Sequence, residues 1–215
     1  IGVAFSPNLK ANLFEAVRLA IFFDSKLFLI HVGEFSEDKT KALKIILASF
    51  KKDDLNYEVI FESGNPVDVI LKATEEKKID LLILGAVQRE RFLKYYVGSI
   101  ARKITRKAKC SILLLIKPSV KRVPCQHIVV NGLKDPKTER TIASAFYVAK
   151  QLQAEIITVV EEIKQEEIKI KVDDDISLRR TNIIKERIKL RENSRIKDII
   201  GHIPKEYTEN IVIKT

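Results

Sequence analysis

Apolar and polar residues follow two different periods along the first half of the chain. Short runs that are apolar at every position, or at every second position, indicate strands, whereas apolar residues spaced three and four positions apart indicate helices. Helical spacing occurs between the runs, for example at Leu13, Ala16, Val17 and Ala20. The runs occur at residues 1–5, 27–32, 57–61, 81–84 and 111–116. The pattern therefore predicts five strands joined mainly by helices.

The runs at 27–32, 81–84 and 112–116 are apolar on both faces. A strand needs two apolar faces when helices cover both sides of a parallel sheet. Residues 1–118 are therefore predicted to form a doubly wound α/β domain. We expect its five-stranded parallel sheet to have the strand order 3-2-1-4-5.

The second half of the chain repeats the beginning of the first half. A linker with two prolines, at 117–124, separates the two copies. Three segments repeat in order: 128–131 matches 1–4, 138–149 matches the helix that ends at Ala20, and 155–160 matches 26–31. Such a repeat predicts a tandem architecture. We expect residues 124–215 to form a divergent second domain that is incomplete, because no fourth or fifth strand follows the third.

Composition excludes several classes of protein. With 46% apolar and 32% charged residues, the 215-residue chain is neither a disordered tail nor a disulfide-stapled miniprotein. No window approaches the roughly 20 apolar residues of a membrane-spanning helix, and no secretory leader is visible. Two cysteines are too few for a disulfide framework or a tetrahedral zinc site. We expect a cytoplasmic protein whose natural N-terminus has been trimmed.

The net charge of +10 raises the question of a polyanionic partner. Basic residues gather at 89–109 and at 179–197. Two interpretations are open, nucleic-acid binding and solvated helix faces. No P-loop, G-x-G-x-x-G turn or known nucleic-acid-binding motif accompanies the charge. The solvated-face interpretation is therefore favoured, and nucleic acid is not expected as a partner.

Candidate chemistry gathers where the predicted strand order reverses. Open parallel sheets bind ligands beyond the carboxyl ends of their strands at this point. Here that edge brings together Ser6, Val32 with the preceding His31, and Gly85. Gly98 and Ser99 follow at the start of a predicted helix, which Ser99 could cap. A glycine next to a positive helix end can accommodate a phosphate, although turn geometry and ordinary capping are the alternative explanation.

The spacing of Gly85, Gly98 and Ser99 resembles the glycine signature of the universal stress proteins. The resemblance spans residues 1–118 and extends more weakly over the repeat, so the whole chain resembles a tandem member of that family. For the ATP-binding branch, the resemblance implies adenine contacts at Val32 and phosphate contacts at the three signature residues. Two positions depart from the family pattern: Gln88 replaces the middle glycine, and Ser6 replaces an aspartate that addresses the nucleoside.

Two functions remain open from the sequence. The first is a cytoplasmic stress-response protein that senses or binds an adenine nucleotide, ATP, at the carboxyl edge of the first sheet. The second is an interaction or dimerisation module with a degenerate pocket, in which the edge strand 111–116 pairs with another copy; Ser6 and Gln88 favour it. Either a homodimer or pairing of the two domains within one chain is expected. Neither a catalytic base nor a metal site is recognisable, so ATP hydrolysis would at most be slow.

Overall fold

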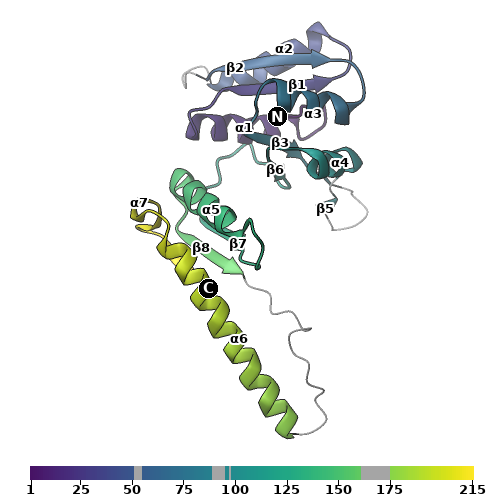
Figure 1. Ribbon diagram of the computed structural model, residues 1–215. Helices are drawn as coiled ribbons and strands as arrows, with labels where there is room; N and C mark the ends of the chain where they lie inside the picture. Colours follow the sequence, from purple (N-terminus) through teal and green to yellow (C-terminus); the bar gives the residue numbers. More distant parts are fainter. Residues whose placement is uncertain (51–54, 89–94, 97, 161–174) are drawn as a thin grey trace. The chain divides into compact units, whose positions relative to one another are not determined.

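The computed structural model describes residues 1–50, 55–88, 95–96, 98–160 and 175–215 (Figure 1). At 87–88 and 95–96 it describes the backbone alone. The chain divides into two compact units, Ile1–Val123 and Pro124–Thr215, which we call unit 1 and unit 2 and treat separately. Among the described helices, none combines the length and the apolar character needed to cross a membrane.

Unit 1 is built on parallel strands. Strand β1 (Leu27–Val32) pairs in parallel with β2 (Tyr57–Glu62). Strand β3 (Leu81–Gly85) pairs in parallel with β6 (Ser111–Leu115). The predicted α/β class with parallel strands is therefore confirmed.

The first residues of the chain lie between these two pairs. The Gly2 N–H donates to the Ile83 carbonyl of β3 (3.1 Å), and the Val3 N–H donates to the Ile30 carbonyl of β1 (2.8 Å). Gly2 and Ile30 form an isolated parallel bridge rather than part of a longer ladder. The predicted strand 1–5 is therefore shorter than expected, because the Ser6 N–H turns back to the Ala4 carbonyl (2.9 Å).

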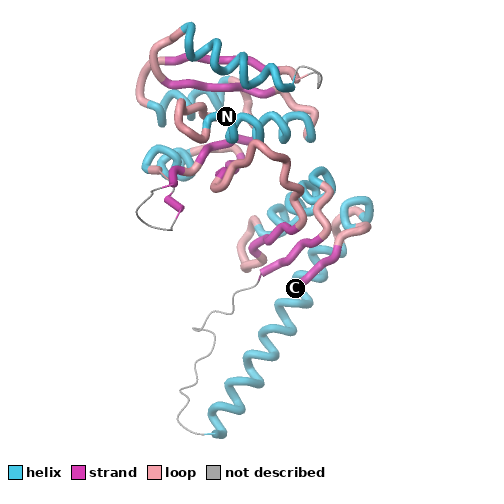
Figure 2. The backbone as a smooth tube through the Cα atoms, turned by 180° about the vertical axis from the view of Figure 1, so that it is seen from behind, coloured by secondary structure: helices cyan, strands magenta, loops and turns pink. Residues whose placement is uncertain are grey.

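Helices cover both faces of the unit 1 strands, as Figure 2 shows. The helices are α1 (Leu9–Phe22), α2 (Glu37–Leu47) with a short 3-10 turn η1 (Ala48–Phe50), α3 (Pro66–Glu76) and α4 (Ser99–Lys107). Leu29 and Ile83 belong to a buried cluster with α1 and α2. The next strand residues, Ile30 and Leu84, belong to a second cluster with α3 and α4. Alternate strand residues thus enter two separate cores, which explains why these strands are apolar on both faces.

A short hairpin follows β3. Strand β4 (Val87–Gln88) pairs antiparallel with β5 (Tyr95–Tyr96). The sequence analysis expected no strand between the runs at 81–84 and 111–116, so the pairing of these four residues is a correction. A ladder of two residue pairs is too short to leave a periodic pattern in the sequence. Residues 89–94 and 97, between and after these two strands, lie outside the described residues.

Unit 2 repeats the strand–helix–strand order on a smaller scale. Its three-stranded parallel sheet has the order β7-β8-β9, formed by His127–Asn131, Ile156–Val160 and Val212–Lys214. Its helices are α5 (Thr138–Leu152), the 27-residue α6 (Asp175–Gly201) and the short α7 (Lys205–Thr208). Phe146 of α5, Ile157 of β8 and Ile196 of α6 are fully buried in its core. Residues 161–174, between β8 and α6, lie outside the described residues.

Candidate functional site

The carboxyl ends of β1 and β3 flank the turn that follows the first residues of the chain. Val32 is the last residue of β1, and Gly85 is the last residue of β3. The parallel bridge between Gly2 and Ile30 puts Ala4 level with Val32, so Ser6 follows at the same edge. The structure therefore brings Ser6, Val32 and Gly85 to one edge of unit 1. We call this edge the carboxyl edge.

Gly85 is covered by a residue that the sequence analysis did not single out. A Cβ atom at Gly85 would lie 2.7 Å from Asn12 Nδ2 and 3.2 Å from Asn12 Cγ. The Asn12 Oδ1 atom is buried and has no hydrogen-bond partner among the described residues. A buried acceptor without a donor is rare in folded proteins and needs an explanation. The sequence feature that could have identified Asn12 is its position: it is a polar residue between Leu9 and Leu13, on the apolar side of a predicted helix.

The four longer helices of unit 1 differ in how their N-terminal ends are capped. Asn65 caps α3 through a bond from the Val67 N–H (2.9 Å), and Ser36 accepts from the Lys39 N–H at α2 (3.5 Å). Both of these helices also have acidic residues in the first turn. In contrast, α1 and α4 have neither a side-chain cap nor an acidic residue in the first turn. The ends of α1 and α4 therefore keep more of the positive potential that attracts anions.

The glycine and serine at the start of α4 are arranged differently from the prediction. Helix α4 begins at Ser99, so Gly98 occupies the cap position, and no side chain caps the helix. The prediction that the Ser99 hydroxyl caps α4 is therefore wrong. Ser99 is exposed, and Gly98 is half-buried. The backbone of Gln88 pairs with Tyr95 in β4–β5, whereas its side chain lies outside the described part of the chain.

His31 occupies the carboxyl edge below the surface. Its ring is buried, and the rings of Phe5 and Phe61 meet it edge-on, with centroids 4.9 and 5.6 Å away. His31 Nδ1 lies 3.0 Å from the Val3 carbonyl, and Nε2 lies 3.1 Å from Lys39 Nζ. A carbonyl only accepts and an ammonium only donates. The imidazole is therefore neutral: Nδ1 carries the proton and donates to the Val3 carbonyl, and Nε2 accepts from the Lys39 ammonium.

The corresponding edge of unit 2 is closed by α6. Arg195 donates through Nη2 to the Gly132 carbonyl, just beyond β7, and pairs through Nε with Glu192 (2.7 Å). This hydrogen bond from Arg195 lowers the pKa of Glu192 below its usual value. A Cβ atom at Gly132 would lie 2.7 Å from Val159 Cγ1 and 3.1 Å from Ile196 Cδ1. The space above Gly132 is thus filled by the protein itself.

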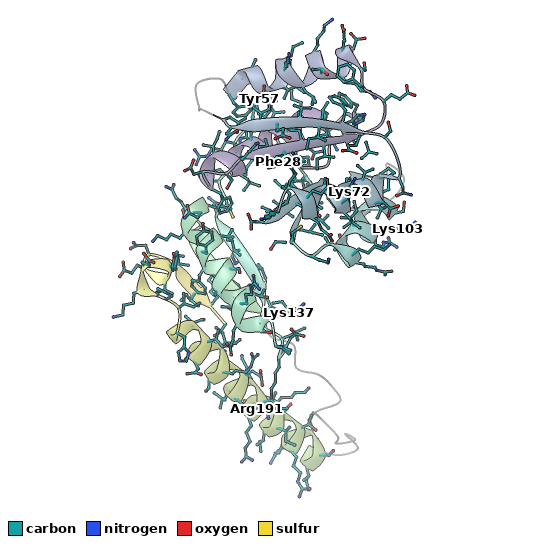
Figure 3. All side chains as sticks on the ribbon, turned by 45° about the horizontal axis from the view of Figure 1, so that its top comes forward. Phe28, Tyr57, Lys72, Lys103, Lys137 and Arg191 are labelled. Carbon is teal, nitrogen blue, oxygen red and sulfur yellow. The ribbon has the colours of Figure 1, made fainter. Side chains whose placement is uncertain are left out.

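Two other features lie away from the carboxyl edge. A cavity of about 530 Å³ in unit 1 lies by the end of α2 and the start of β2. Its lining residues are Lys44, Ile45, Leu47, Ala48, Phe50, Leu55 and Tyr57. Because Tyr57 begins β2, this cavity lies toward the amino ends of the strands. Basic side chains such as Lys72 on α3 and Lys103 on α4 are exposed, as Figure 3 shows.

The remaining reactive side chains are dispersed. Cys110 and Cys125 are both free, and burial raises the pKa of the Cys125 thiol, which disfavours the nucleophilic thiolate. Within the described residues, no group of three or more His, Cys, Asp or Glu side chains is arranged to hold a metal ion.

Comparison with known proteins gives consistent similarities. Residues 34–115 match the model of the universal stress protein family. A universal stress protein of Methanocaldococcus jannaschii is 23% identical over 123 residues, which cover 48% of this chain and 72% of that protein.

Two solved structures are similar to nearly the whole chain. A universal stress protein from Archaeoglobus fulgidus aligns with a TM-score of 0.65 and 17% identity, covering 99% of this chain and 74% of that one. A functionally unknown protein from Pseudomonas aeruginosa aligns with a TM-score of 0.68 and 15% identity, covering 100% and 72%. At these identities the structural similarities establish the fold alone.

Proposed function

Unit 1 of this chain belongs to the universal stress protein family, and on that premise we propose that it binds an adenine nucleotide, ATP, at its carboxyl edge. Val32 would contact the adenine, and Gly85, Gly98 and Ser99 would surround the phosphates. The observation that supports this most strongly is the contrast in capping. Four longer helices are described in unit 1. Two of them, α1 and α4, have no side-chain cap and no acidic residue in the first turn, whereas α2 and α3 have both.

The residues at this edge fit such a ligand chemically. Backbone N–H groups at the start of α4 are the donors that phosphate oxygens need, and Gly98 adds no side chain in front of them. Asn12 lies against Gly85 and its Oδ1 is buried without a donor, so it would accept from a ligand hydroxyl or amino group only after the side chain moves away from Gly85. Ser6 can donate or accept a hydrogen bond but adds no negative charge. These residues would bind and orient the nucleotide, and ATP hydrolysis would at most be slow.

The test is calorimetric titration of the full chain with ATP, combined with thermal melting. We expect heat of binding and a rise in Tm. A Ser99→Asp variant should weaken ATP binding about tenfold or more, because a carboxylate at the start of α4 repels phosphate. The same carboxylate interacts favourably with the helix dipole, so the fold should persist.

The matched control is Ser111→Asp, which adds the same charge at an exposed position of β6. It should bind ATP like the unmodified chain. Absence of both heat and thermal shift at millimolar ATP would reject the proposal. Equal ATP affinity of the Ser99→Asp variant and the unmodified chain would reject the phosphate position at α4.

A second candidate function is an interaction or dimerisation module. It is supported by the edge of β6, since β6 pairs only with β3 in the described part of unit 1 and Ile116 beyond it is 48% exposed. Open strand edges favour pairing with another copy. Sedimentation at several concentrations tests this function. If the chain is a monomer at every concentration and binds ATP, the dimerisation function is rejected and the ATP-binding function is retained.

The order of the strands in unit 1, the relation between the two units and the localisation are proposed as well. We propose that the first residues form the central strand of one sheet in the order 3-2-1-4-5. The bonds of Gly2 to Ile83 and of Val3 to Ile30 support this order. We also propose that residues 1–118 and 124–215 are tandem copies and that the protein is cytoplasmic, which its two free cysteines support.

A further inference from the structure

The long helix α6 carries an exposed apolar row along its first half. The row consists of three aliphatic residues that are 62%, 50% and 67% exposed: Ile176, Ile183 and Leu190. Consecutive members are seven residues apart, which is nearly two helical turns, so the three side chains follow one line over about 21 Å of the helix. We call these three residues the aliphatic row. Such a row differs from the isolated exposed aliphatic residues that are normal on protein surfaces.

The aliphatic row is separate from the side of α6 that is buried. Thr181 and Ile188 are buried, and helical geometry puts them about 150° around the helix from Ile183. In its second half, α6 contributes the fully buried Ile196 to the core of unit 2, whereas its first half extends past the strands of unit 2 (Figure 1). A surface helix needs only one apolar stripe to pack. Packing among the described residues of unit 2 therefore does not account for the row.

Arginines flank the aliphatic row. On the helix surface, Arg180 and Arg187 lie to one side of Ile183, and Arg179 lies to the other. In the described part of the chain, no carboxylate oxygen lies within 4.0 Å of these three guanidinium groups. Glu186 lies on the same side of the helix, so three arginines are accompanied there by fewer acidic residues. The whole helix contains eight Lys and Arg against four Asp and Glu, a net charge of +4.

The aliphatic row and the arginines together indicate which kind of partner fits. A nucleic acid would pair with the arginines but leave the aliphatic row in water. A second α6 packed along the row would bring the arginines of both helices together, and like charges in contact oppose association. An anionic lipid surface fits both features, because aliphatic side chains enter the boundary of the acyl chains while guanidinium groups stay among the headgroup phosphates.

We propose that the aliphatic row and the flanking arginines of α6 bind the surface of an anionic lipid membrane. The helix lies parallel to the membrane plane, since it is not apolar enough to cross. The net charge of +10 adds attraction between the chain and anionic headgroups. The inference goes beyond the proposed function: it concerns unit 2 and does not depend on nucleotide binding by unit 1.

The experiment is co-sedimentation of the full chain with vesicles of two compositions, phosphatidylcholine alone and an equimolar mixture of phosphatidylcholine and phosphatidylglycerol. We expect binding to the anionic vesicles to be about tenfold or more stronger than to the neutral ones, and to weaken as salt screens the arginines. Ile183→Gln should weaken binding to the anionic vesicles about tenfold or more, because the centre of the row no longer favours the acyl boundary. Glutamine is a good helix former, so α6 should persist, which circular dichroism verifies.

The matched control is Leu178→Gln. Leu178 is exposed on the same helix but follows Ile176 by two residues, so it lies on the opposite side of the helix from the row. This variant should bind the anionic vesicles like the unmodified chain. Arg187→Gln, in contrast, should weaken binding about fivefold, the usual effect of one basic residue at a lipid surface.

Three results would overturn the proposal. The first is absence of binding to the anionic vesicles, or equal binding to both kinds of vesicle. The second is equal binding of the Ile183→Gln variant and the unmodified chain. The third is self-association of the chain without lipid that Ile183→Gln abolishes in analytical ultracentrifugation, because the row would then be a contact between copies.

Discussion

At the scale of single residues, Glu58 connects two lysines near the amino end of β2. Its carboxylate accepts from Lys26 and from Lys77, each at 2.8 Å. These two hydrogen bonds lower the pKa of Glu58 from 4.5 to about 2. All three side chains are more than a third exposed, so solvent screens the pairs and their contribution to stability is modest.

The lowered pKa predicts a pH dependence of stability. A carboxyl group whose pKa is lower in the folded protein stabilises the fold above its usual pKa, and this contribution disappears as the pH falls. The difference in free energy of unfolding between the chain and a Glu58→Gln variant should therefore be constant above about pH 5. It should shrink as the pH falls from 4.5 toward 2. Urea unfolding at several pH values measures it.

The matched control is Glu76→Gln, which removes a carboxylate that contacts a single lysine, Lys72, at 3.6 Å. The control should lose less stability at neutral pH than Glu58→Gln does. A difference between the chain and Glu58→Gln that stays the same from pH 6 to pH 2.5 would contradict the assignment.

Individual residues also mark how far the site could be predicted. Ser6, Val32 and Gly85 could be assigned to one edge because parallel strands end on the same side of a sheet. The contact of Asn12 with Gly85 and that of Lys39 with His31 could not be assigned in this way. Both contacts come from helices that follow the strands, and their side-chain positions depend on how each helix packs rather than on the strand pattern.

At the scale of elements, the helix caps of unit 1 allow a direct comparison of two asparagines. Asn65 precedes α3 and accepts from the Val67 N–H (2.9 Å), whereas Asn8 precedes α1 and makes no side-chain cap bond. Asn65→Ala should therefore lower the free energy of unfolding by about 1 kcal/mol. Asn8→Ala should change it by less than about 0.5 kcal/mol. Chemical denaturation of both variants measures the difference, and equal losses would contradict the capping assignment.

The elements that were predicted best are those with long, uniform patterns. The strand expected at 27–32 is observed at Leu27–Val32, and the helical spacing from Leu13 to Ala20 lies within α1. A buried strand and an amphipathic helix each repeat their pattern several times, so the period is recognisable. The β4–β5 hairpin involves four residues and has no such repetition.

At the scale of the whole molecule, α1 holds the end of unit 1 through Arg18. Its guanidinium donates to the carbonyls of Ser119 (2.9 Å), Val120 and Lys121 (3.4 Å). Glu15 pairs with Arg18 (3.4 Å) and accepts from the Ser119 N–H (3.1 Å). The proline-containing linker predicted at 117–124 is thus attached to unit 1 over part of its length.

This attachment predicts resistance to proteolysis. Arg18→Ala removes a charged donor from three carbonyls, so trypsin cleavage after Lys121 should accelerate about tenfold. Arg140→Ala, which changes an exposed arginine on α5, should leave that cleavage rate unchanged. Mass spectrometry of timed digests identifies the product. An unchanged rate for Arg18→Ala would show that these hydrogen bonds do not protect the linker.

The closure of unit 2 by Arg195 and Ile196 has a consequence for stoichiometry. If unit 2 is the tandem copy proposed above, its carboxyl edge corresponds to that of unit 1, but there a guanidinium and an isoleucine already occupy the place above Gly132. Saturation of the chain with nucleotide should therefore be reached at one equivalent rather than two. Unit 2 would then contribute to the structure without binding a nucleotide itself.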